Sequence, residues 1–173
     1  SKLKNEEQAG IARKDGLETV ALRFFNVYGP GQSFEGSYAS VIPKISEKII
    51  RGEKPIIYGD GLQTRDFIHV SDVALSILNI LSLDWKETIS SVYNVATQHQ
   101  TSLLELVEII NTSCLKIGLI QDSLEPIFET AREGDIRHSV ASTERITKEI
   151  GWSPLIDINQ GIHQLIEEKW VVE

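Results

Sequence analysis

The chain has 173 residues, of which 41% are hydrophobic and 24% are charged, a balance that is typical of globular domains and excludes an intrinsically disordered protein. Its formal net charge of −8 argues against non-specific binding to nucleic acid or to anionic membranes, because the field of the protein repels both. The single cysteine, Cys114, excludes an intramolecular disulfide, and no apolar run approaches the roughly 18 residues of a membrane span, so we expect a cytoplasmic protein.

The chain begins with one α/β unit. Residues 2–14 predict a helix, which Asp15-Gly16 ends. Residues 19–25 are almost continuously apolar and rich in β-forming side chains, which indicates a strand buried on both faces, as in parallel sheets. The turn-dense segment 26–37 follows at the carboxyl end of that strand, where open α/β sheets bind ligands. Its glycines do not make the spacing of a dinucleotide-binding loop, and the competing interpretation is a long surface loop.

The middle of the chain carries a glycine-rich turn between two short strands. Isoleucine spacing predicts a helix over 39–51, in which Pro43 is tolerated only in the first turn. Residues 55–58 and 66–70 predict strands, and the turn between them gives this region a hairpin-like arrangement. Ser71 is expected to cap the helix that follows.

The second half predicts one more helix with a defined start. Ser102 and Glu105 make a capping box, which opens a helix lined by apolar side chains. The other expected elements are a strand over 91–96, an edge strand over 125–130 and two short helices over 142–150 and 158–170. The fold class that follows is α/β, with an α/β piece and a small α+β lobe.

Arg65 and Arg132 are the strongest candidates for an anion site. Each lies beside a glycine-containing loop, and a guanidinium group binds two phosphate oxygens at once, so the two arginines together can clamp a diphosphate. The alternative interpretation is that each arginine pairs with a neighbouring carboxylate. The candidate carboxylates are Asp66 or Asp72 for Arg65 and Glu133 or Asp135 for Arg132. Spacing alone leaves both interpretations open.

Three further polar residues are weaker candidates. Asn26 follows the predicted strand and either binds a ligand hydroxyl or phosphate or caps the strand end through its own backbone. Asp135 follows a glycine and either binds a ribose or is a turn residue. Arg137 is a candidate of the same kind as Arg132.

Other reactive residue types carry structural expectations. His69 lies in an apolar strand and is interpreted as a core or edge histidine. Ser71 and Asp72 are too close to His69 in sequence to form a triad around one reacting centre. Cys114 lies in an apolar helical run and is interpreted as packing. The histidines and the one cysteine show no metal-ligand spacing, so no metal site is predicted.

Taken together, these motifs resemble the carboxyl-terminal half of the NAD-dependent epimerase/dehydratase family, the extended short-chain dehydrogenase/reductases that act on nucleotide sugars. The matching motifs occur in the order of the family and cover nearly the whole chain. They are Ser-Lys at 1–2, Leu-Arg-Phe-Phe-Asn-Val-Tyr-Gly-Pro at 22–30, Val-Ile-Pro at 41–43, Ile-Tyr-Gly-Asp-Gly-Leu-Gln-Thr-Arg-Asp-Phe-Ile-His-Val-Ser-Asp at 57–72, Tyr-Asn-Val-Ala at 93–96 and Arg-Glu-Gly-Asp-Ile-Arg-His-Ser at 132–139.

The resemblance assigns expected roles to individual residues. Lys2 matches the lysine of the Tyr-x-x-x-Lys pair, which holds the nicotinamide ribose of NAD and lowers the pKa of the catalytic tyrosine. Phe24 and Phe25 fall where the chain passes the nicotinamide. The expected substrate-binding residues are Asn26 at the diphosphate, Val41 and Tyr58 at the base, Arg65 and Arg132 as the phosphate clamp, and Asp135 at the ribose.

The resemblance implies the substrate-binding part of a nucleotide-sugar epimerase, most similar to UDP-glucose or UDP-N-acetylglucosamine 4-epimerases. The catalytic tyrosine and the glycine-rich cofactor loop of the family have no counterpart in these residues, so the isolated chain is expected to be inactive. Ser40 stands where several relatives have an asparagine that helps to hold the nucleotide. The alternatives are a 4,6-dehydratase or decarboxylase of the same family, or a non-catalytic nucleotide-sugar-binding or assembly module.

The implied architecture is a partial Rossmann-type parallel sheet plus a substrate-binding lobe. Residues 1–30 and about 66–118 are expected to belong to the sheet, and about 31–65 and 119–173 to the lobe. A buried parallel strand needs neighbours on both sides, so we expect either a further amino-terminal half or a homo-oligomer to cover the exposed edges.

Overall fold

The computed structural model describes residues 2–34, 40–84 and 90–172. The helices are α1 (Lys2–Lys14), α2 (Val41–Ile50), α3 (Val70–Leu81), α4 (Leu103–Ile117), α5 (Glu144–Ile150) and α6 (Ile158–Glu167), with a π-helical turn, η1 (Glu168–Val172), at the end. The strands are β1 (Ala21–Phe24), β2 (Asn26–Tyr28), β3 (Ile56–Tyr58), β4 (Thr64–Arg65), β5 (Phe67–His69), β6 (Val92–Val95), β7 (Thr101–Ser102) and β8 (Ile127–Glu129). The chain is therefore an α/β protein built from short strands.

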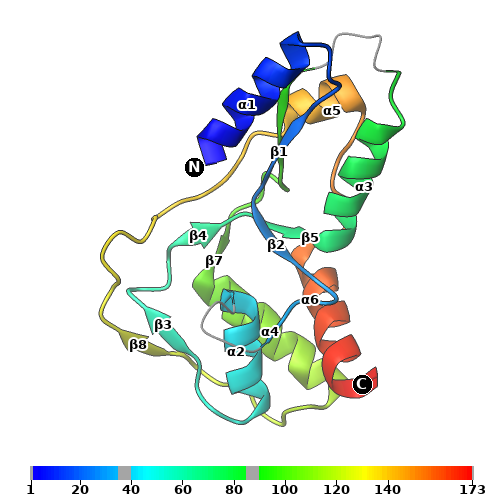
Figure 1. Cartoon of the computed structure of the whole chain (residues 1–173). Coiled ribbons are helices and arrows are strands. Elements are labelled where there is room, and N and C mark those ends of the chain that lie inside the picture. The colour runs from blue at the N-terminus through cyan, green and yellow to red at the C-terminus, as the bar shows by residue number, and fades with distance from the viewer. Residues whose placement is uncertain (1, 35–39, 85–89, 173) are drawn as a thin grey trace.

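The molecule has two parts, which β2 and β5 connect (Figure 1). One part holds the parallel pair β1–β6 with α1, α3 and α5, and the other holds α2, α4 and α6 with the pair β3–β8. Each part has its own group of buried apolar side chains. The first group includes Ile68, Val73, Tyr93, Ile146 and Trp152. The second includes Tyr28, Ile42, Ile49, Ile110, Ile162 and Ile166.

The predicted helix of the capping box is confirmed. The Ser102 hydroxyl accepts a hydrogen bond from the Glu105 backbone N–H at 3.1 Å, and the Glu105 carboxylate accepts from the Ser102 backbone N–H at 2.7 Å. The expected helices over 2–14, 39–51 and 142–150 are also present, and Pro43 lies in the first turn of α2, where its missing N–H costs nothing. Residue 39 lies outside the described residues.

The predicted cap of α3 is wrong by two positions. The helix begins at Val70, and its N-cap is His69, whose Nδ1 accepts a hydrogen bond from the Ser71 backbone N–H at 3.3 Å. Ser71 therefore lies inside the first turn. The error arises because histidine is not one of the preferred capping residues. Here its ring nitrogen accepts the capping hydrogen bond that a serine hydroxyl usually accepts.

The predicted strand over 19–25 is present but is not buried on both faces. β1 is half-buried at its start and exposed at Arg23 and Phe24. After an interruption at Phe25 the chain continues as β2, which the sequence interpretation placed in a loop. β2 was missed because Asn26 and Tyr28 are polar and precede a glycine, whereas its pairing with β5 depends on residues far away in sequence.

The middle strands do not form a hairpin. β3 pairs in parallel with β8, and β4 pairs antiparallel with β7. The glycine turn that follows β3 therefore leads away from that strand rather than back along it. The edge-strand prediction for 125–130 is confirmed, because β8 is exposed along its length and, among the described strands, pairs only with β3.

Two buried carboxylates join distant loops to the strand and helix that follow the glycine turn. Asp66 accepts hydrogen bonds from Thr97 N and Oγ1 and from Gln98 N at 2.7 to 3.0 Å. Asp72 accepts from the backbone N–H groups of Leu155 and Ile156 at 3.0 and 3.1 Å. Both side chains are thus fully used in holding the fold. No helix in the described part of the chain has the length and apolarity needed to cross a membrane.

Candidate functional site

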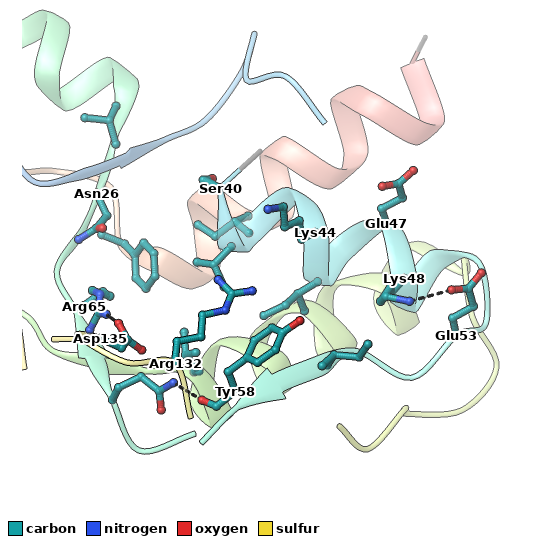
Figure 2. Close-up of a pocket in the computed structure, with 18 of the residues that line it drawn as sticks. Asn26, Ser40, Lys44, Glu47, Lys48, Glu53, Tyr58, Arg65, Arg132 and Asp135 are labelled. Atoms are coloured by element: carbon teal, nitrogen blue, oxygen red, sulfur yellow. Dashed lines mark hydrogen bonds and ion pairs between the residues drawn. The ribbon is translucent and has the colours of Figure 1, made fainter. Parts of the chain in front are cut away.

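A cavity of about 790 Å³ lies between α2, β3 and the loop that joins β8 to α5 (Figure 2). Its walls combine segments far apart in sequence, because Phe67 of β5 and residues 132–135 of the loop over 131–139 line it together with α2. The candidates from the sequence that line it are Asn26, Val41, Tyr58, Arg65, Arg132 and Asp135. The fold thus brings all six expected substrate-binding residues to one pocket.

The wall from α2 follows helical spacing. Val41, Lys44 and Lys48 lie at intervals of three and four residues, so they share one face of the helix, and all three line the cavity. Opposite this face, Tyr58 ends β3, and the chain then turns through Gly59 and Gly61. Both glycines have positive φ angles, 84° and 76°, which other residues rarely adopt.

Arg65 is held by three contacts. Its Nη1 donates to the carbonyl oxygens of Thr64 and Ile136, and its Nη2 donates to Asp135 Oδ1. The side chain is only 19% exposed, so the guanidinium is fixed at the cavity wall. The alternative that Arg65 pairs with Asp66 or Asp72 is wrong, because backbone N–H groups already occupy those two buried carboxylates.

Arg132 is held differently. Its guanidinium carbon lies 3.8 Å from the centre of the Tyr58 ring, in a cation–π contact, and Figure 2 shows it over the ring within the pocket. The alternative of an ion pair with Glu133 or Asp135 is wrong among the described residues, where Arg132 makes no ion pair. Its donors therefore remain available to a ligand.

The loop over 131–139 is tied to the glycine turn. Arg137 donates to both carboxylate oxygens of Asp60 at 2.6 and 2.9 Å, which lowers the pKa of Asp60 to about 2. Thr64 exchanges backbone hydrogen bonds with Arg137 and Ser139. Arg137 is thus an anchor of the loop and does not line the cavity. Asp135 lies at a turn, since its N–H donates to the Arg132 carbonyl, and its binding of a ribose stays a prediction.

Asn26 connects two strands beside the pocket. Its Nδ2 donates to the carbonyl oxygen of Asp66 across the β2–β5 pair at 2.9 Å. The alternative that it caps its own backbone is therefore wrong. Its place on the cavity wall leaves the ligand-binding interpretation as a prediction.

Lys2, Phe24 and Phe25 lie away from this cavity, in the other part of the molecule. Glu6 of α1 accepts two hydrogen bonds from Arg23 of β1, at 2.8 and 2.7 Å. This ion pair holds the first turns of α1, which carry Lys2, beside the carboxyl end of β1, which carries Phe24. The Phe24 side chain is 46% exposed there.

The sequence interpretation missed several residues of the cavity. Gln63 is buried, and its Nε2 donates to the Tyr58 carbonyl at 2.7 Å, so it fixes the turn between Tyr58 and Arg65. No sequence signal marks it. Lys44 and Lys48 could have been found, because helical spacing places them on the face that Val41 occupies.

The charge of the cavity is nearly balanced by internal ion pairs. Arg65 pairs with Asp135, Lys48 with Glu53 and Arg51 with Glu47. The remaining charged residues on the wall are Lys44, Arg132 and Glu133, none of which makes an ion pair with a described residue. Two cations thus face the cavity without a carboxylate partner, which suits an anionic ligand.

His69 and Cys114 do not belong to the site. Burial lowers the pKa of His69, against an opposing effect of Asp72, and the ring packs edge-on against Tyr28. Burial raises the pKa of Cys114 to about 11, as expected for a thiol that serves as packing. Both structural interpretations are confirmed.

Comparison with known proteins agrees with this geometry. A sequence model of the NAD dependent epimerase/dehydratase family matches residues 1–96. A UDP-glucose 4-epimerase of Mycolicibacterium smegmatis is 32% identical over 142 residues, which are 82% of this chain and 42% of that protein. The chain thus spans less than half the length of this relative.

Two solved structures are also similar. The UDP-glucose 4-epimerase of Thermotoga maritima, solved with UDP-glucose, superposes with a TM-score of 0.82 at 28% identity over 95% of this chain and 50% of that one. The UDP-N-acetylglucosamine 4-epimerase of Methanobrevibacter ruminantium, solved with UDP-N-acetylmuramic acid, superposes with a TM-score of 0.79. It is 35% identical, and the match covers 94% of this chain and 49% of that one. The fold is therefore part of a Rossmann-type epimerase fold.

Proposed function

The chain belongs to the NAD dependent epimerase/dehydratase family, and from this premise we propose that its cavity binds the nucleotide diphosphate of a UDP-sugar. The observation that carries the proposal is that Arg65 and Arg132, from β4 and from a loop far along the chain, line the same pocket. Two guanidinium groups supply the paired donors that a diphosphate needs. For the protein as a whole, the activity that we propose is NAD-dependent 4-epimerisation of a UDP-sugar.

The lining residues divide the pocket into regions. Val41 and the Tyr58 ring offer apolar and aromatic surface on which a base can stack. Arg65 and Arg132 hold the two phosphates, with the Asn26 amide beside them. Asp135 accepts hydrogen bonds from the ribose hydroxyls. In this arrangement the sugar extends from the diphosphate toward β2, because Asn26 lies at the start of that strand.

The residues expected to contact NAD fit that group in their placement, because two of them, Lys2 and Phe24, lie in one region of the molecule. The Arg23–Glu6 ion pair brings the start of α1 to the carboxyl end of β1, so Lys2 and the exposed ring of Phe24 lie in the same region. Lys2 would donate to the nicotinamide ribose, and Phe24 and Phe25 would pack beside the ring. These residues would hold a nicotinamide group that could take up a hydride from the sugar and return it.

We also propose that further protein covers part of the surface. Leu3 and Ile11 of α1 and Leu78 and Leu81 of α3 are each at least 59% exposed. Such side chains on two helices of one part of the molecule are typical of an interface. Light scattering that shows a monodisperse monomer, with little dye binding to apolar surface, contradicts this proposal.

Calorimetric titration of the 173-residue chain with UDP, uridine and inorganic pyrophosphate tests the binding proposal. UDP should bind, and uridine should bind at least about tenfold more weakly, because it leaves both arginines without phosphate oxygens, each charge-assisted hydrogen bond contributing roughly 1.5 kcal/mol or more. Equal affinities for UDP and uridine would show that the arginines do not bind the diphosphate.

A further inference from the structure

Arg65 faces the pocket with most of its donors already used. Its Nη1 donates to two carbonyl oxygens, those of Thr64 and Ile136. Its Nη2 lies 2.5 Å from Asp135 Oδ1. A guanidinium group has five N–H donors, so Nε–H and the second Nη2–H of Arg65 remain for a phosphate, which would then lie beside the Asp135 carboxylate.

Asp135 can leave that position without moving its loop. The backbone on its carboxyl-terminal side is fixed by the hydrogen bonds of Thr64 with Arg137 and Ser139, and by the Arg137–Asp60 pair. On its other side the Asp135 N–H is bonded to the Arg132 carbonyl. Only the carboxylate contact to Arg65 must break, which requires a side-chain rotation. The structure thus has a fixed loop with one exchangeable contact.

We propose that Asp135 competes with anionic ligands for Arg65 and thereby determines which anions the pocket accepts. This inference rests on the proposed function of the pocket and adds a role to Asp135 within it. An anion that binds Arg65 either displaces the Asp135 carboxylate and loses that ion pair, or lies beside the carboxylate and is repelled by it. A ligand regains this loss only if it carries hydroxyl donors beside its phosphates, because these donors can satisfy the displaced carboxylate.

The consequence is selectivity against small inorganic anions. Pyrophosphate has the charge of a nucleotide diphosphate but no hydroxyl groups, so it leaves the displaced Asp135 beside its own negative oxygens. A nucleoside diphosphate also carries a ribose, whose hydroxyl groups can donate hydrogen bonds to the Asp135 carboxylate. Asp135 is therefore a specificity-determining residue, distinct from Glu133, which lies on the same wall and makes no ion pair with a described residue.

The test is calorimetric titration of pyrophosphate and of UDP into the wild-type chain and five variants: Asp135→Asn, Asp135→Ala, Glu133→Gln, Arg65→Ala and the double variant Arg65→Ala/Asp135→Asn. Glu133→Gln removes the same charge from the same pocket and measures the general electrostatic effect. We expect Asp135→Asn to bind pyrophosphate at least about tenfold more tightly than the wild type, a change of 1.4 kcal/mol. Glu133→Gln should change the affinity for pyrophosphate by no more than about threefold, the effect of a screened charge.

The gain must depend on Arg65. Relative to Arg65→Ala alone, the double variant should therefore bind pyrophosphate within about threefold. Asp135→Ala should reproduce the gain of Asp135→Asn, and thermal melts of each variant exclude unfolding as the cause. The ratio of UDP affinity to pyrophosphate affinity should fall at least about tenfold in Asp135→Asn.

Two results overturn the inference: equal gains in Asp135→Asn and Glu133→Gln, or no measurable gain in either Asp135 variant. Its failure is separable from that of the proposed function. UDP binding to the wild-type chain decides the function of the pocket, whereas the comparison of the Asp135 and Glu133 variants with pyrophosphate decides the role of Asp135.

Discussion

The guanidinium carbon of Arg132 lies 3.8 Å from the centre of the Tyr58 ring, so a cation of the cavity that makes no ion pair with a described residue rests on an aromatic face. This contact joins β3 to the loop over 131–139. It orders Arg132 while leaving its N–H groups directed to the sides, where a phosphate can reach them.

The Tyr58 ring is therefore predicted to support ligand binding by its face and not by its hydroxyl group. Tyr58→Phe should keep UDP affinity within about twofold, whereas Tyr58→Leu should lower it at least about fivefold, because both the cation–π contact and base stacking are lost. Calorimetry with UDP measures both. Equal affinities of the two variants would count against this role for the ring.

Asp66 is predicted to be essential for stability. Its carboxylate is fully buried and accepts three hydrogen bonds from the Thr97–Gln98 segment. Asp66→Asn places an N–H₂ group against those donors and should lower the free energy of unfolding by about 2–4 kcal/mol in urea denaturation. The exposed Glu108→Gln serves as the control and should change it by less than about 0.5 kcal/mol. Equal stabilities of the two variants would contradict the structural role of Asp66.

Gly161 is predicted to be required by the close approach of α6 to Tyr28. A Cβ atom at this position would lie 2.3 Å from the Tyr28 hydroxyl oxygen. Gly161→Ala should therefore destabilise the fold by about 1–3 kcal/mol, and Tyr28→Phe in the same chain should recover part of this loss. Gly10→Ala is the matched control, because its Cβ would meet nothing within 4 Å in α1, and it should stabilise by up to about 1 kcal/mol. Thermal melts distinguish the two substitutions.

Cys114 is predicted to be unreactive in the folded chain. Its pKa is raised to about 11 from 9.0, so at pH 8 the thiol is protonated as well as buried. Ellman's reagent should label it rapidly in urea and very slowly without urea. Since the fold favours the neutral thiol, this group should also lower stability as pH rises from 9.0 to about 11. Rapid labelling of the native chain at pH 8 would show that the helix α4 is not packed as described.

Local features of the fold were predictable from the sequence, and features that depend on distant partners were not. The four residues from Ser102 to Glu105 predict the start of α4 without reference to any other part of the chain. No such local pattern predicts β2, because it becomes a strand only through its pairing with β5. The parallel pairing of β3 with β8 is equally long-range and replaced an expected hairpin.

The candidate site shows the same division. Arg65 and Arg132 were recognisable as arginines beside glycine-containing loops, but spacing could not bring them into one pocket, and the family resemblance supplied that expectation. The partner of Arg65 was not predictable, because nearby Asp66 is a better guess by distance in sequence than Asp135. Asp66 is unavailable only because a loop some thirty residues later donates to it.

The most direct test of the account compares UDP binding in Arg65→Ala, Arg132→Ala and Arg145→Ala by calorimetry. Arg145 is exposed on α5 and does not line the cavity, so Arg145→Ala removes the same positive charge at a distance from the site. The account predicts that each of the first two variants binds UDP at least about tenfold more weakly than the wild type and that Arg145→Ala stays within about twofold. Equal affinities in all three variants would contradict the diphosphate clamp.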